Sequence, residues 1–194
     1  MVKLIVGQDQ EVVLTPEALL RSRSLFFDAA LKSCWQTGPG PTKTITLPAD
    51  SPSVVNLYVK QLDGGAKELN HNMPSLVDRD CRGDVHRGWS EDGLVLAKLY
   101  AFSDRILDSK VKLEIEWLFA FIQPFAHVVN QVYLVTMPGS HMRKLCIVGH
   151  GPHWYKGQVV PYNEEFLRDI WWPLCRAPCQ YLWHNVDGEW PSRT

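Results

Sequence analysis

The sequence lacks a long apolar run and a strong excess of either charge. No stretch approaches the roughly 18 consecutive apolar residues that a membrane span needs, and no basic segment followed by an apolar run opens the chain. Lysine and arginine number 20 against 21 aspartate and glutamate residues, a balance that disfavours binding to nucleic acid or to an anionic membrane. We therefore expect a soluble intracellular protein, located in the cytoplasm, the nucleus or both.

The sequence also lacks a disulfide framework and any familiar catalytic motif. It contains no Gly-x-Ser-x-Gly elbow, P-loop, Gly-x-Gly-x-x-Gly turn or His-Glu-x-x-His helix. With 194 residues, 45% of them hydrophobic, the chain can bury a full core without a metal or a disulfide. We predict a protein without catalytic activity and without a cofactor. The cysteines are odd in number and scattered, so reduced thiols are expected: Cys34, Cys81, Cys146, Cys175 and Cys179.

What the chain does have is a clear series of short elements, beginning with a β-hairpin. In the first strand Val2, Leu4 and Val6 alternate with Lys3 and Ile5. Residues 7–10 can turn the chain, and residues 12–14 form a second β-favouring run. Thr15 can then cap a helix whose first residue is Pro16. Glu17 in its first turn suits the helix dipole.

Three further elements follow this first helix. The polar run 21–24 interrupts the helix, and Ser24 can cap a second one that carries Phe26 and Phe27. Residues 44–47 alternate as a half-buried strand. A helix beginning at residues 51–53 is then indicated by apolar residues at helical spacing: Val54, Leu57, Tyr58 and Leu62.

Residues 63–93 contain few large apolar side chains, so they cannot bury enough surface to offset the entropy of ordering. We predict a long mobile loop there. Residues 94–102 are apolar almost all round and predict a central, buried helix. A further helix is predicted from Lys110, and Gln123 and Pro124 end it. It is indicated by an apolar stripe at helical spacing: Val111, Ile115, Leu118 and Ile122.

The last third of the chain predicts three more helices. The first covers residues 128–135, and the second places Met142, Leu145 and Cys146 on one face. Asn163 can cap the third, which ends near Pro173. Its apolar residues are Phe166, Leu167, Ile170 and Trp171. The fold class is therefore α/β of the α+β kind, with a small mixed sheet clasped by helices and a C-terminal helical extension.

Four stretches, in this order, resemble the BTB/POZ family, and the BTB-domain proteins of filamentous fungi in particular. They are EVVLTPEALLRSRSLFFDAAL at residues 11–31, Thr44 to Pro52 with the helix that follows, Leu96 to Asp108, and Met142 to Leu145 together with Glu165 to Ile170. The resemblance implies a BTB/POZ-like domain over residues 1–122, with an inserted mobile loop at 63–93, and a C-terminal helical extension over residues 123–194.

The resemblance also implies a function, that of a non-catalytic protein–protein interaction module. Its partner would be a second BTB subunit, giving a homo-oligomer, or a cullin-type scaffold for which the chain serves as a substrate adaptor of a ubiquitin ligase. In the family the scaffold-facing surface corresponds roughly to Leu94 to Ile122 here, where we expect more core residues than contacts. No individual contact residue is predicted.

Two departures from the family pattern bear on partners. The swapped dimers of many animal BTB proteins use an additional strand and helix before the hairpin, and here the hairpin begins almost at Met1, so that mode of dimerisation is not expected. Where many members carry Val-His-Lys before the first helix, this chain has Thr15, Pro16 and Glu17. The resemblance then implies that a buried histidine contact is lost.

The alternative is a small zinc- or cysteine-dependent enzyme centred on Cys175, Cys179 and nearby histidines. His184 follows Cys179 by five positions, but a structural zinc site needs a fourth ligand that is not nearby. A loop pair, His150 and His153, adds imidazoles near His141 without a recognisable ligand spacing.

The other notable groups have plainer interpretations. Arg143 and Lys144 are expected to be a solvated helix face rather than a phosphate site. Aromatic residues concentrate toward the C-terminus, where we expect them to divide between core and interface: Trp154, Tyr155, Trp171, Trp172, Trp183 and Trp190.

Overall fold

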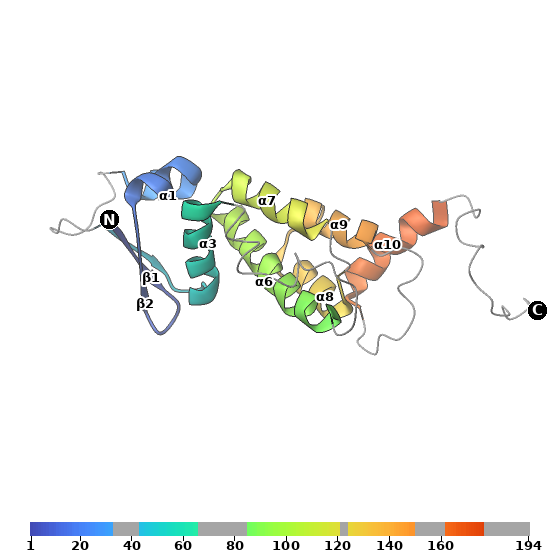
Figure 1. The fold of residues 1–194 in the computed structure, drawn as a ribbon. Helices are drawn as coiled ribbons and strands as arrows, with labels where there is room; N and C mark the ends of the chain where they lie inside the picture. The colour runs from blue at the N-terminus through green and yellow to red at the C-terminus, as the bar shows by residue number, and fades with distance from the viewer. Residues whose placement is uncertain (33–42, 66–84, 121–123, 150–161, 177–194) are drawn as a thin grey trace, which may run out of the picture.

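The computed structural model describes residues 1–32, 43–65, 85–120, 124–149 and 162–176, without the side chains of residues 85–91, 149 and 171–176. Over these ranges the chain is mixed α/β, as the sequence predicts. A small sheet lies at one end, and the helices extend away from it (Figure 1). None of the described helices combines the length and the apolar character needed to cross a bilayer.

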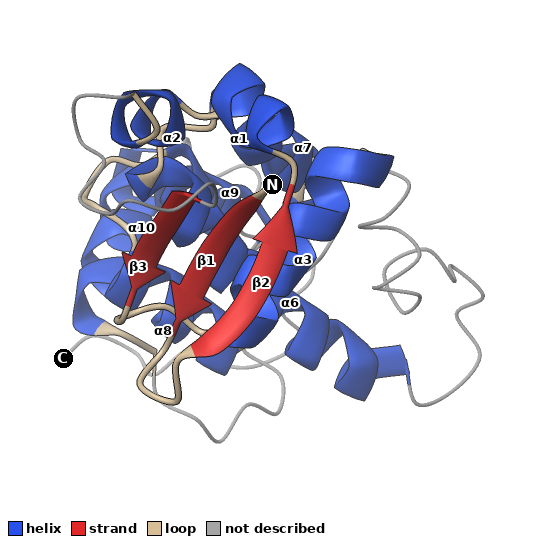
Figure 2. Ribbon diagram, turned by 90° about the vertical axis from the view of Figure 1, so that its left-hand side faces the viewer, coloured by secondary structure: helices blue, strands red, loops and turns tan. Residues whose placement is uncertain are grey.

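The sheet has β1 (Val2–Val6) at its centre, with β2 (Glu11–Thr15) antiparallel on one side and β3 (Lys43–Leu47) parallel on the other. The predicted hairpin and third strand are thus confirmed. Gly7 has φ +72° in the hairpin turn, a conformation that favours glycine. Figure 2 shows the helices behind the three strands, so one face of the sheet is covered.

The helix pair α1 (Glu17–Arg23) and α2 (Leu25–Ala30) follows β2 directly. The predicted cap at Thr15 is wrong, because Thr15 is the last residue of β2, pairs with Val2 and is fully buried. Pro16 is not the first helical residue but the N-cap itself, in an extended conformation and without a side-chain hydrogen bond. The cap at Ser24 is confirmed, since its hydroxyl accepts a hydrogen bond from the Phe27 amide.

The predicted loop at 63–93 is too long at both ends. Helix α3 (Pro52–Gly64) continues past residue 62 and is capped by Gly65, whose φ of +66° suits a helix terminus. Helix α6 (Val85–Arg105) begins before residue 94. Adding a residue to an existing helix is far easier than starting one, so a polar segment can extend a helix that is anchored by its buried part. The rest of the predicted loop, residues 66–84, lies outside the described residues.

Helix α6 is the central helix, as predicted, and its neighbour α7 runs antiparallel to it over Ser109–Phe119. Helix α7 starts one residue before the predicted Lys110. It ends before Ile122, which lies outside the described residues. The ring of Phe102 on α6 meets that of Tyr58 on α3 edge to face, with centroids 5.2 Å apart. This contact joins the helices that cover the sheet to the central helix.

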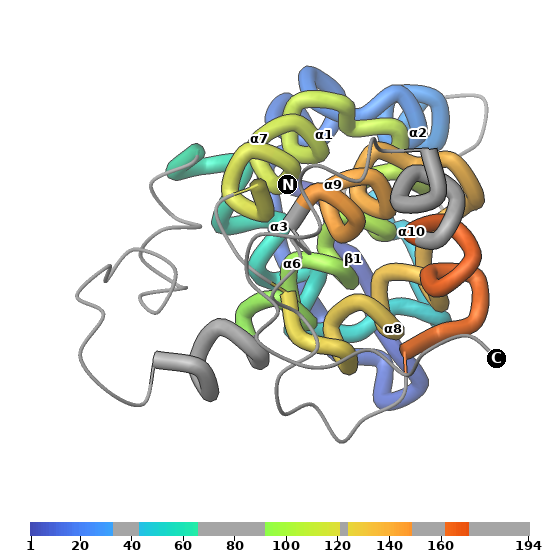
Figure 3. The backbone as a smooth tube through the Cα atoms, turned by 90° about the vertical axis from the view of Figure 1, so that its right-hand side faces the viewer, coloured from blue at the N-terminus to red at the C-terminus, as the bar shows by residue number. Residues whose placement is uncertain are grey.

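The C-terminal helices are α8 (Ala126–Val135), α9 (His141–Gly149) and α10 (Glu164–Arg176). They lie together at the end of the molecule away from the sheet (Figure 3). Helix α8 packs on α6, and the buried side chains of both belong to one hydrophobic core that runs from Val2 to Ile170. The predicted cap at Asn163 is confirmed, since its side chain accepts hydrogen bonds from two amides of the first turn of α10.

Arg143 corrects the prediction of a solvated basic face. Its side chain is buried, whereas the neighbouring Lys144 is exposed. The Arg143 guanidinium donates to the backbone oxygens of Tyr133 at 2.8 Å and Thr136 at 2.6 Å, which end α8, and pairs with Glu165 of α10 at 2.6 Å. It also lies over the Tyr133 ring, 4.4 Å from the centroid. One side chain of α9 thus fastens all three helices, because a cation suits the carbonyl end of a helix.

Replacing Arg143 with methionine should therefore destabilise the protein by about 2–3 kcal/mol, because buried carbonyls lose their donors. The matched control is Lys144→Met on the same helix, for which a change within about 0.5 kcal/mol is expected at an exposed site. Urea unfolding of the full chain, followed by circular dichroism, measures both. Equal midpoints for the two variants would contradict the assigned role of Arg143.

Candidate protein-interaction surface

The candidate site forms where the junction of α1 and α2 meets the junction of α6 and α7. Ser24 stands between α1 and α2, and its hydroxyl donates to the backbone oxygen of Ile106, 82 positions later in the chain. The amide of Phe26 donates to the same oxygen at 3.4 Å. These bonds hold two distant turns of the chain against each other.

Asp108 fixes the second of these junctions from inside. It is fully buried and caps α7 by accepting a hydrogen bond from the Val111 amide at 3.0 Å. Its other oxygen accepts from the Tyr58 hydroxyl at 3.0 Å and lies 3.7 Å from Nε of Arg23. Burial, reinforced by the charge of Asp108, raises the pKa of Tyr58, so its phenol remains a hydrogen-bond donor. The carboxylate thus joins α1, α3 and α7.

Apolar side chains point outward around this fixed junction. Leu25 is 70% exposed and Leu107 is 57% exposed, with Phe26 also accessible beside Leu25. Because Phe26 and Ser24 both bind the backbone oxygen of Ile106, the residue before Leu107, these three exposed residues belong to two turns whose backbones touch. We call Leu25, Phe26 and Leu107 the junction patch. Exposed aromatic and large aliphatic groups on a rigid frame are typical of protein-binding surfaces.

Leu107 also has an unusual backbone. Its φ is +59°, the left-handed region, which costs a residue other than glycine about 1–2 kcal/mol. An exposed leucine gains little packing in return. Such strain is concentrated at functional sites, and a glycine would suit this conformation better. The left-handed residue closes α6, because the amides of Leu107 and Asp108 donate back to the oxygens of Asp104 and Ser103, as is typical of a helix C-terminus.

A second apolar strip continues along α7. Leu113 and Trp117 are exposed and stand four residues apart, one above the other on the helix surface. The predicted stripe on the opposite side is buried, as Val111 and Ile115 show. Sequence reasoning did not identify Leu113 and Trp117. The signal was present, because both residues fall between the positions of the buried stripe.

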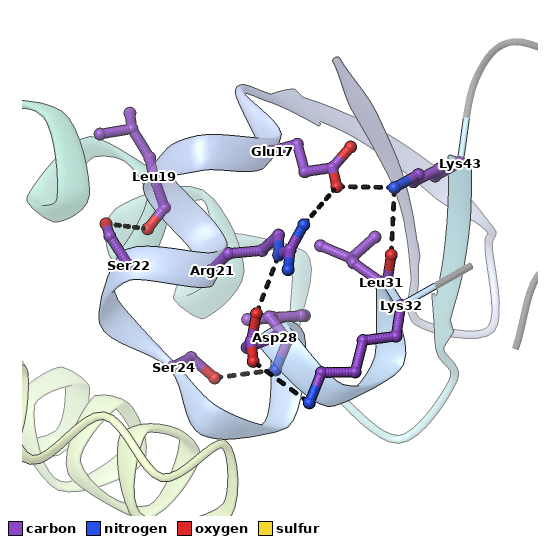
Figure 4. Close-up of polar contacts among 10 residues, drawn as sticks. Glu17, Leu19, Arg21, Ser22, Ser24, Asp28, Leu31, Lys32 and Lys43 are labelled. Carbon is purple, nitrogen blue, oxygen red and sulfur yellow. Dashed lines mark hydrogen bonds and ion pairs between the residues drawn. The ribbon is translucent and has the colours of Figure 1, made fainter. Parts of the chain in front are cut away.

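Beside the junction patch, charged side chains attach the helix pair to the sheet. Lys43 of β3 lies 2.6 Å from Glu17 of α1 and donates to the backbone oxygen of Leu31, which ends α2, at 3.0 Å (Figure 4). Arg21 pairs with Asp28 across the two helices at 2.9 Å. The hydrogen bond from Lys43 lowers the pKa of Glu17, and Arg21 lowers that of Asp28. Glu17, one of the three residues that depart from the pattern which the sequence otherwise resembles, thus has a charged partner within the fold, Lys43.

The residues of the alternative enzyme site are not brought together among the described side chains. Cys175 lies on α10 with its side chain undescribed, and Cys179 and His184 lie outside the described residues, as do His150 and His153. Within the described ranges no group of three or more His, Cys, Asp or Glu side chains could hold a metal ion. The predicted aromatic positions 154, 155, 183 and 190 are likewise outside, and the side chains at 171 and 172 are not described.

Two residues singled out in the sequence do have defined surroundings. His141 at the start of α9 places Nδ1 2.8 Å from a carboxylate oxygen of Glu116, whose other oxygen accepts from the Tyr100 hydroxyl at 2.9 Å. Cys146 is fully buried, and burial raises the pKa of its thiol to about 12. A thiol with that pKa is a poor nucleophile, because the thiolate is the reactive form.

In comparisons with known proteins, no family model, no curated protein and no solved structure matches this chain.

Leu107→Gly should separate binding from stability. Glycine removes the left-handed strain but adds freedom to the unfolded chain, so the free energy of unfolding should change by less than about 1 kcal/mol. Partner binding should nevertheless weaken. The matched control is Gln10→Gly, which relieves a φ of +54° in the hairpin turn away from the patch. Thermal unfolding and partner capture are measured on both variants. Unchanged capture by Leu107→Gly would contradict a binding role.

Acid should weaken the attachment of the helix pair. Because the folded-state pKa of Glu17 is lowered, its stabilising contribution is complete above the ordinary glutamate pKa and is lost as the pH falls through the lower, folded value. Melting temperatures between about pH 5 and pH 3 should therefore fall less steeply for Glu17→Gln than for the wild type. Asp63→Asn, which removes an exposed carboxylate on α3, is the control and should keep the wild-type slope.

Proposed function

We propose that this chain is a non-catalytic protein–protein interaction module of the BTB/POZ type. The order of its elements supports this proposal: a hairpin, a helix pair, a third strand parallel to the first, a covering helix and then a central helix. The observation that carries the proposal is the junction patch, in which exposed apolar side chains are held by buried hydrogen bonds.

The chemistry of this surface favours binding over turnover. Leu25, Phe26 and Leu107 offer no nucleophile, acid or base, and their anchoring bonds use backbone groups and a buried carboxylate. A rigid apolar surface loses little conformational entropy when a partner covers it. Hot spots of protein interfaces are commonly formed by such groups at the centre of a contact.

We propose an intracellular partner, a cullin-type scaffold for which the chain acts as an adaptor of a ubiquitin ligase. The exposed strip on α7 supports this assignment, because Leu113 and Trp117 lie in the region that faces the scaffold in the family that the sequence resembles. The C-terminal helices, fastened by Arg143, would then carry the surface that recruits a target.

The test is capture of cullin subunits by the tagged full chain in the cells that naturally produce it, quantified by mass spectrometry. Leu113→Asp should reduce cullin recovery by at least about tenfold, since a charge at the centre of an apolar contact is desolvated without a partner. Leu134→Asp, at an exposed position on α8, is the control and should retain capture. Recovery of self peptides alone would replace the adaptor assignment with self-association.

A further inference from the structure

The face of the sheet that the described helices leave open carries a second apolar surface, separate from the junction patch. Val12 and Leu14 of β2 are 48% and 58% exposed, while Val13 between them is buried. In the sheet register Val12 stands beside Ile5 of β1, which is half-buried on the same face. Figure 2 looks onto this face, and none of the described helices lies in front of it.

Strand β2 is also an edge strand of the described sheet, since it pairs with β1 alone. Natural edge strands are usually protected by a lysine, a proline or a bulge that prevents pairing with another chain. Residues 11–15 contain no lysine and no proline, and Pro16 follows only where the strand has ended. The only charge is that of Glu11 at the start of the strand, and Asn56 of α3 donates to it at 3.1 Å.

We infer that β2 pairs with β2 of a second copy of this chain, in antiparallel orientation and centred on Val13. The two sheets then form one sheet of six strands, with a two-fold axis through the central pair. In this register Val12 stands opposite Leu14 of the second copy, and Leu14 opposite Val12. Glu11 stands opposite Thr15.

The strand is self-complementary in this register, which selects a second copy over an unrelated partner. The outward row consists of apolar residues on both sides of the axis, and no charge faces a like charge. On the inner face, the pairing brings a polar group to Thr15, whose buried hydroxyl has no hydrogen-bond partner among the described residues. The Glu11 carboxylate of the second copy is directly opposite it, on the same face of the sheet.

The other edge of the sheet lacks these properties. The outward residues of β3 are Thr44 and Thr46, which are polar, and Lys43 of that strand is held by Glu17. The inference does not rest on the proposed function, because it uses neither the junction patch nor α7. It supplies a route to a dimer that needs no strand before the hairpin.

The first experiment measures the mass of the full chain in solution by size-exclusion chromatography with light scattering. The wild type and the control Thr46→Lys on β3 should have twice the mass of 22.2 kDa, and Val12→Lys should have the monomer mass. A monomeric wild type, or a dimeric Val12→Lys, would overturn the inference.

The second experiment tests the register and guards against misfolding of the lysine variant. Leu14→Glu alone should also be monomeric, but an equal mixture of Val12→Lys and Leu14→Glu should regain the dimer mass, because the lysine of one variant then stands opposite the glutamate of the other. Recovery of the dimer would show that both variants are folded. A mixture that stays monomeric while circular dichroism shows both chains folded would contradict the register.

Discussion

The carboxylate of Asp108 is fully buried, so its charge must be balanced by groups of the protein. An unsatisfied buried charge costs several kcal/mol, and here three separate helices supply the partners, two of them hydrogen-bond donors and the third a guanidinium in an ion pair. The Tyr58 hydroxyl, the guanidinium of Arg23 and the first amides of α7 must therefore keep their places together. These contacts hold the sheet and its covering helices to the helical part of the molecule. The backbone that carries the exposed leucines around Asp108 is therefore rigid.

Arg143 meets the same physical requirement at the other end of the molecule with the opposite charge. Its guanidinium satisfies carbonyl groups that the end of α8 leaves unpaired, and a carboxylate at the start of α10 balances the charge. In both places a buried ion replaces solvent at a helix end. The two ions define where the helices stop, and hence where the chain can turn.

The sequence was sufficient for features whose cause is local. The hairpin, the caps at Ser24 and Asn163, and the buried faces of α6 and α8 follow from alternation, helical spacing and short polar side chains. It was insufficient where a tertiary contact decides. Strand pairing with Val2 removed Thr15 from the helix cap, and burial between three helices turned Arg143 from a surface charge into a structural one.

The junction patch shows the same division. Phe26 was predicted on its helix, but the position of that helix beside Ile106 depends on the hydrogen bond from Ser24, 82 positions away, and helical spacing carries no information about such a contact. Leu113 and Trp117 were readable as residues outside the buried stripe of α7. Their exposure needed no tertiary information, only attention to the positions between the apolar ones.

The order of strands in the sheet has a consequence for how the chain folds as it is made. The central strand β1 is synthesised before both of its neighbours. Its parallel pairing with β3, in which Val2 stands beside Lys43, can form only after Lys43 has been synthesised. Pairings between residues so far apart in the chain close slowly, because the intervening loop must first lose its entropy. Until β3 and the covering helices emerge from the ribosome, the hairpin presents both of its apolar faces to water. This stage of synthesis is therefore the one at which a chaperone would have most to protect.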